Sequence, residues 1–132
     1  MRPLLVRACR REPVERTPVW YMRQAGRCLA EYRELRERYG ILEMARNPEL
    51  CARVTAMPVV RLGVDAAVLY ADIMLPLDGM GVPFHIEPDV GPIVERPVRS
   101  ADDVAALRVI PAEDATPYLF TAIGELRRSL PV

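Results

Sequence analysis

Proline is the residue that most constrains what this chain can fold into, since 13 of the 132 residues are proline. That is about twice the share usual in globular proteins. Each proline removes a backbone donor and clashes with the preceding turn of a helix, so the sequence excludes a bundle of long, uninterrupted helices. Apolar residues make up 51% of the chain, enough for a real core. We therefore expect one domain at most, built from short elements.

The charge pattern excludes several classes of function. Basic and acidic residues balance at 18 each, which argues against a dedicated nucleic-acid or anionic-membrane binder. No apolar run approaches the roughly 18 residues of a membrane span, and residues 1–7 are too short an apolar stretch for a secretory signal. We expect a cytoplasmic protein. Every basic residue is arginine, so lysine Schiff-base chemistry is excluded within these residues.

Cysteine and histidine give no sign of a metal or redox centre. The three cysteines, Cys9, Cys28 and Cys51, have neither metal-ligand nor CxxC spacing. We interpret them as free thiols in a reducing compartment. His85 is the only histidine, so no histidine-based zinc site or catalytic triad can come from this chain alone. We expect no metal and no cofactor.

The apolar pattern predicts helices that alternate with short strands. Two apolar runs bounded by proline, glycine or aspartate predict buried strands over residues 18–22 and 66–70. We expect helices over residues 4–9, 29–39, 41–45, 48–62, 104–107 and 118–128. Between them, residues 84–86 and 93–94 predict a small hairpin, and residues 111–116 a linker.

This alternation indicates an α/β fold with parallel strands. Two or three such strands alone leave exposed edges and uncovered apolar faces. The chain also ends, after its last helix, in what resembles the start of a third strand. We therefore expect a truncated chain.

The segment from Met22 to Arg27 follows the first expected strand, where α/β folds bind ligands. Its candidate binding residues are Arg23, Gln24, Ala25, Gly26 and Arg27. Each guanidinium can hold a carboxylate or phosphate through two parallel hydrogen bonds, so the set suits a polyanionic small molecule. Alternatively, the two arginines are surface residues paired with Glu31 or Glu34.

Asp72 ends the second expected strand, in the sequence Leu69 to Pro76. A carboxylate there can accept N–H bonds or stabilise a developing positive charge. The alternative is a cap of the Asx type on the turn that follows.

Two segments of the chain resemble known sequence signatures. Residues 17–27, TPVWYMRQAGR, together with Glu31-Tyr32-Arg33, strongly resemble the N-terminal signature of the uroporphyrinogen decarboxylase family. Residues 65–73 and 79–81 resemble its next segment, and the likeness runs from about Leu4 to the end of the chain.

The resemblance implies a single (β/α)₈ barrel, usually a homodimer, that works in haem and tetrapyrrole synthesis. The family removes carbon dioxide from the four acetate arms of uroporphyrinogen, giving coproporphyrinogen, without cofactor or metal. Residues 1–132 would form the N-terminal portion of that barrel domain and be inactive alone, because a complete barrel needs about 250 residues.

The resemblance also implies roles for individual residues. Residues 23–27 line the cleft, with Arg23 and Arg27 on substrate carboxylates, and Arg36 matches a further substrate-side arginine. Asp72 accepts hydrogen bonds from the pyrrole N–H groups, and the proton donor is either Arg23 or a substrate carboxyl that an arginine holds. The chain departs from the family at Cys28 and Ala30, where Tyr and Pro are usual.

Two other functions stay open at this point. One is a corrinoid-linked methyltransferase on a similar barrel, which the paired arginines disfavour. The other is a non-catalytic fragment that binds a tetrapyrrole or a partner.

Overall fold

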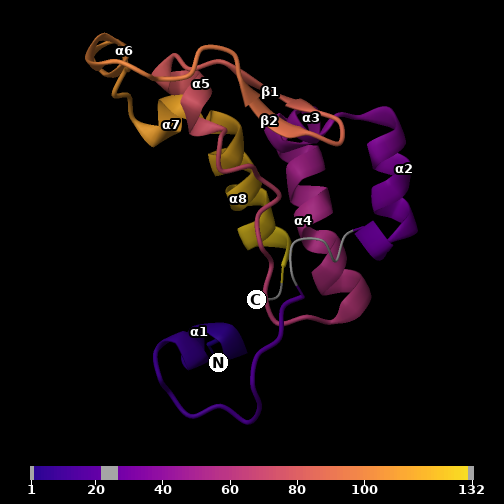
Figure 1. The fold of residues 1–132 in the computed structure, drawn as a ribbon. Helices are drawn as coiled ribbons and strands as arrows, with labels where there is room; N and C mark the ends of the chain where they lie inside the picture. The colour runs from indigo at the N-terminus through magenta and orange to yellow at the C-terminus, as the bar shows by residue number, and fades with distance from the viewer. Residues whose placement is uncertain (1, 22–26, 131–132) are drawn as a thin grey trace.

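The computed structural model describes residues 2–21 and 27–130. Helices α4 and α8 cross the middle of the molecule, with α3 and a hairpin at one end and α1 at the other (Figure 1). The helices are α1 (Leu4–Cys9), α2 (Ala30–Arg38), α3 (Ile41–Arg46), α4 (Pro48–Leu62), α5 (Pro76–Met80), α6 (Ala101–Ala105), α7 (Ala112–Ala115) and α8 (Pro117–Ser129). The strands are β1 (Phe84–Glu87) and β2 (Gly91–Val94).

Helix α4 has the bounds that its local sequence predicts. Asn47 caps it by accepting a hydrogen bond from the Leu50 N–H at 3.0 Å, and Pro48 occupies the first helical position, where no donor is needed. The helix ends at Gly63, whose φ of 63° lies in the left-handed region that glycine enters without a steric penalty.

Other local predictions are also confirmed. β1 and β2 pair antiparallel, with Phe84 opposite Val94, and they form the predicted hairpin. The helix expected over residues 104–107 lies earlier in the chain, because Ser100 and Asp103 make a reciprocal capping box and α6 spans Ala101–Ala105.

The prediction of a linker over residues 111–116 is wrong, because Ala112–Ala115 form the short helix α7. Its first turn carries Glu113 and Asp114, and acids are favourable at that end of the helix dipole.

The core lies on both sides of α4 and consists of three clusters of buried side chains. One joins α2, α3 and α4, the second joins α4 and α8, and the third joins α3 to α5 and β1. Met44, Cys51 and Leu75 are fully buried within them. Tyr70 packs against all three clusters, so the chain segment that leads to Asp72 is held at the centre of the fold.

The prediction of two parallel strands, over residues 18–22 and 66–70, is wrong. No strand is formed over residues 18–21 or 66–70, and the only sheet among the described residues is the two-stranded hairpin. A strand needs a backbone partner along its length, but side chains of α4 satisfy the Tyr70 backbone instead. The Tyr70 N–H donates to Thr55 Oγ1 at 2.8 Å, and its carbonyl accepts from Cys51 Sγ at 3.2 Å. The structure is therefore mixed α/β with few strands.

Candidate functional site

The structure describes three of the residues that the sequence nominates. Arg27 precedes α2, Arg36 lies in the last turn of α2, and Asp72 follows Tyr70 in the segment between α4 and α5. The other four, Arg23, Gln24, Ala25 and Gly26, lie outside the described residues.

Arg27 and Cys28 form a short turn that leads into α2, and Arg33 holds that turn. The Arg33 guanidinium donates to the carbonyl oxygens of Arg27 and Cys28 at 3.1 and 2.9 Å. Leu29, which is buried against α4, follows directly. The backbone of Arg27 is thus held by a side chain one turn into the helix, and Arg27 itself is exposed.

Arg27, Arg33 and Arg36 line one open hollow of about 470 Å³. Its remaining lining residues are Tyr32, Glu37 and Ile41. Arg36 is held in place by donating to the Tyr39 carbonyl at 2.7 Å. Three cations against one carboxylate give the hollow a net positive charge.

None of these three arginines has a carboxylate within ion-pair distance in residues 2–21 and 27–130. The alternative that Arg27 pairs with Glu31 or Glu34 is therefore wrong: among the described residues Glu31 binds Arg61 at 3.1 Å, and Glu34 forms no ion pair. The same alternative for Arg23 falls outside the described residues. The positive charge of these arginines is therefore available to pair with an anionic ligand.

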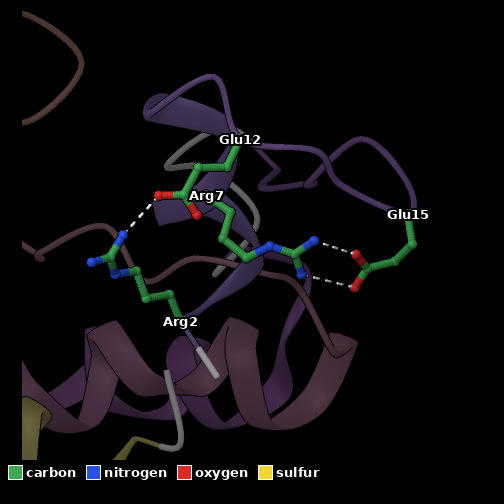
Figure 2. Close-up of a pocket in the computed structure, with 4 residues that line it drawn as sticks. All are labelled: Arg2, Arg7, Glu12 and Glu15. Atoms are coloured by element: carbon green, nitrogen blue, oxygen red, sulfur yellow. Dashed lines mark hydrogen bonds and ion pairs between the residues drawn. The ribbon is translucent and has the colours of Figure 1, made fainter.

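A second hollow differs from the first because its arginines form ion pairs with its own glutamates. It has a volume of about 540 Å³ beside α1 and is lined by Arg2, Arg7, Glu12 and Glu15. Figure 2 shows the two ion pairs across it, Arg2 to Glu12 at 2.7 Å and Arg7 to Glu15 at 3.0 Å. Its cations are already matched by acids, so it offers no comparable excess of positive charge.

Asp72 forms a hydrogen-bonded turn with the residues that follow it. One carboxylate oxygen, Oδ1, accepts from the Met74 N–H at 2.9 Å, and the Asp72 carbonyl accepts from the Leu75 N–H at 3.2 Å. This is the Asx-type cap. The other oxygen, Oδ2, accepts no hydrogen bond from the described residues, so the carboxylate keeps a free acceptor.

Tyr32 and Tyr70 join the arginine hollow to the segment that carries Asp72. Their hydroxyl oxygens lie 3.3 Å apart and their rings meet edge to face. Burial, followed by the hydrogen bond to Tyr32, raises the pKa of Tyr70 well above its ordinary value, while the charges of Arg36 and Arg27 act in the opposite direction.

Sequence reasoning missed Tyr32, Arg33 and Tyr70 as parts of the site. Tyr70 stands two residues before Asp72 at the end of an apolar run, which is a signal of core packing and not of a polar contact. Tyr32 and Arg33 fall within the family signature, which gave them no role. The contacts of Arg33 follow only from the turn geometry, because its partners are main-chain carbonyls.

Two kinds of feature are absent from the described residues. They hold no group of three or more histidine, cysteine, aspartate or glutamate side chains that could bind a metal ion. Within the same residues no helix is both long and apolar enough to cross a membrane.

The comparisons with known proteins all point to the same family. A family model described as uroporphyrinogen decarboxylase (URO-D) matches residues 2–132. The uroporphyrinogen decarboxylase of Carboxydothermus hydrogenoformans is 54% identical over 130 residues, which cover 98% of this chain and 37% of that protein. That of Thermus thermophilus is 52% identical over 129 residues, or 98% of this chain and 38% of that protein. The chain thus spans little more than a third of the length of these relatives.

Proposed function

The chain belongs to the uroporphyrinogen decarboxylase family, and from this premise we propose that it supplies the carboxylate-binding part of a site that decarboxylates uroporphyrinogen. The observation that carries the proposal is the hollow lined by Arg27, Arg33 and Arg36, none of which forms an ion pair with a described carboxylate. The product is coproporphyrinogen, in the pathway of haem biosynthesis.

The arginines suit such a substrate because each guanidinium matches the planar fork of a carboxylate. A charged hydrogen bond of this kind stabilises a complex by about 1.5–3 kcal/mol. Arg27 and Arg36 are the substrate-binding residues within the described part of the chain, and Arg23, Gln24, Ala25 and Gly26 extend the same site.

Asp72 has a catalytic role at the ring nitrogens. Its oxygen Oδ2, which the Asx turn leaves open, accepts hydrogen bonds from the pyrrole N–H groups. Those bonds strengthen when the ring becomes a cation, so the carboxylate stabilises the transition state more than the neutral substrate.

The chemistry balances without a further reactant. A proton adds to a pyrrole carbon and makes the ring an electron sink. The electron pair of the bond between the acetate methylene and its carboxylate then moves into the ring, and carbon dioxide leaves. The methylene carbon takes a second proton and becomes a methyl group, while the ring carbon loses the first. Arg23, or a substrate carboxyl that an arginine holds, is the donor in this proposal.

Family membership supports three wider proposals. Residues 1–132 form the N-terminal portion of one (β/α)₈ barrel domain, the complete protein is a homodimer, and it works in the cytoplasm. The first is supported by the coverage of 37–38% of the relatives, because that share is too small for a whole barrel.

A chimera tests the proposed function. Residues 2–130 replace the matching segment of the Thermus thermophilus relative, to which the chain is 52% identical, and coproporphyrinogen formation is measured. We expect turnover in the chimera, and its loss in Arg27→Gln and Asp72→Asn variants that stay folded. Arg53→Gln, on the exposed face of α4, serves as the control. A folded chimera without turnover, or variants as active as the control, would contradict the proposal.

A further inference from the structure

Arg33 donates hydrogen bonds to three consecutive main-chain carbonyls. Its side-chain nitrogen Nη1 donates to the carbonyl oxygen of Arg27 at 3.1 Å and to that of Cys28 at 2.9 Å. Its backbone N–H donates to the Leu29 carbonyl at 3.2 Å. A helical side chain leans toward the N-terminus of its helix, so Arg33, one turn into α2, reaches back over the residues that precede the helix. A single residue thus holds the whole turn by which the chain enters α2.

Burial of Leu29 anchors the same turn only at the end nearest the helix. The two bonds from Nη1 extend that hold to Cys28 and Arg27. Nη1 carries two N–H groups, and both are used by these carbonyls. The part of the Arg33 guanidinium that faces the turn is therefore committed to the backbone.

Arg27 depends on this turn more than Arg36 does. The Arg27 guanidinium makes no hydrogen bond or ion pair with residues 2–21 or 27–130, so within that part of the chain only the backbone fixes where its side chain starts. The Arg36 guanidinium is held directly, because it donates to the Tyr39 carbonyl at 2.7 Å. Arg33 is therefore placed to act on one of the two arginines and not on the other.

We propose that Arg33 is a positioning residue, which fixes the backbone of Arg27 and thereby the place from which the Arg27 guanidinium meets a substrate carboxylate. This inference rests on the proposed function, because it takes Arg27 as a substrate-binding residue. The other role open to a cation at this hollow is direct contact with a carboxylate, and the two roles predict different results.

The first test observes the hydrogen bond itself and does not depend on the proposed function. The 132-residue chain is labelled with carbon-13 at its cysteine carbonyls, which gives one resonance for each of Cys9, Cys28 and Cys51. We expect Arg33→Gln to move the Cys28 resonance upfield, because that carbonyl loses a donor, and to leave the other two in place. Arg38→Gln removes an exposed cation from the same helix and should move none of the three.

The second test measures binding of uroporphyrinogen to the chain in a cycle of double variants. We expect Arg33→Gln alone to raise the dissociation constant about tenfold, and in an Arg27→Gln background less than about twofold, because the group that it places is already absent. In an Arg36→Gln background the loss should again be about tenfold, because the Tyr39 carbonyl holds Arg36 independently. Direct contact with substrate, or a merely structural role, would give the same loss in both backgrounds.

The outcomes separate the two proposals. An unchanged Cys28 resonance in Arg33→Gln overturns the positioning role, whether or not the chain binds uroporphyrinogen, and equal losses in the two backgrounds overturn it as well. A wild-type chain that fails to bind contradicts the proposed function, while the Cys28 resonance still decides whether Arg33 holds the turn. If Arg33→Gln does not fold, Arg33→Lys takes its place, because it keeps the cation on a shorter stem without the fork, and the same changes are expected at smaller size.

Discussion

Replacing Tyr70 with alanine tests whether this side chain joins the three parts of the core. Tyr70 packs against all three clusters and its hydroxyl bonds that of Tyr32. Deleting a fully buried large aromatic side chain typically costs about 3–5 kcal/mol, since favourable transfer free energy is lost and a cavity is left. Tyr70 is partly buried, so we expect a loss near the lower end of that range. Native domains are stable by only about 5–15 kcal/mol, so Tyr70→Ala should remove a large part of the free energy of unfolding.

The hydroxyl accounts for a small share of that effect. Tyr70→Phe keeps the ring and loses one neutral hydrogen bond, which contributes about 0.5–1.5 kcal/mol. Urea unfolding at about 25 °C, followed by far-ultraviolet circular dichroism and Trp20 fluorescence, gives both free energies. Val68→Ala is the matched control, because Val68 lies two residues away and is 48% exposed. A Tyr70→Ala loss below about 1 kcal/mol, or one no larger than that of the control, would refute the reasoning.

Three further predictions concern packing, capping and pH. Gly79→Ala should destabilise the chain by about 1–3 kcal/mol in urea unfolding, because an added Cβ would lie 2.8 Å from the Ala115 Cβ; an unchanged midpoint would contradict the close approach of α5 and α7. Asn47→Ala should cost about 1 kcal/mol by the same measurement through loss of the α4 cap, and Asn47→Asp should restore it. Burial raises the pKa of the Cys51 thiol to about 11, so the folded state holds this proton more tightly than the unfolded chain, whose thiol titrates near about 8.5. Stability should therefore fall as pH rises from about 8.5 to 11, with a shallower fall in Cys51→Ala; equal slopes would contradict it.

Local signals in the sequence predicted the longer helices and the hairpin, but not the short helices α5 and α7. Asn47, Pro48 and Gly63 mark the two ends of α4, and the hairpin turn is likewise set by neighbouring residues. The strands over 18–22 and 66–70 could not be predicted in the same way. Their apolar pattern indicates burial, but a strand depends on a distant backbone partner, and at Tyr70 the side chains of Thr55 and Cys51 take that place.

The sequence predicted the charged residues of the site but not the contacts that hold them in place. Arg27 and Arg36 were nominated from pattern and resemblance, and the structure places both at one hollow. The contacts that hold them are not readable from spacing, because Arg33 and Arg36 donate to main-chain carbonyls. Asp72 combines both interpretations of its sequence position, as it caps a turn with one oxygen and leaves the other available.

The central claim is that the hollow beside α2, lined by Arg27, Arg33 and Arg36, binds the carboxylates of uroporphyrinogen. Isothermal titration of uroporphyrinogen into the 132-residue chain, kept free of oxygen, tests it most directly. We predict binding that weakens about tenfold to a hundredfold in Arg36→Gln, the loss expected for one charged hydrogen bond, and that weakens further in the Arg27→Gln/Arg36→Gln double variant. Affinities of both variants equal to that of Arg53→Gln would contradict the claim.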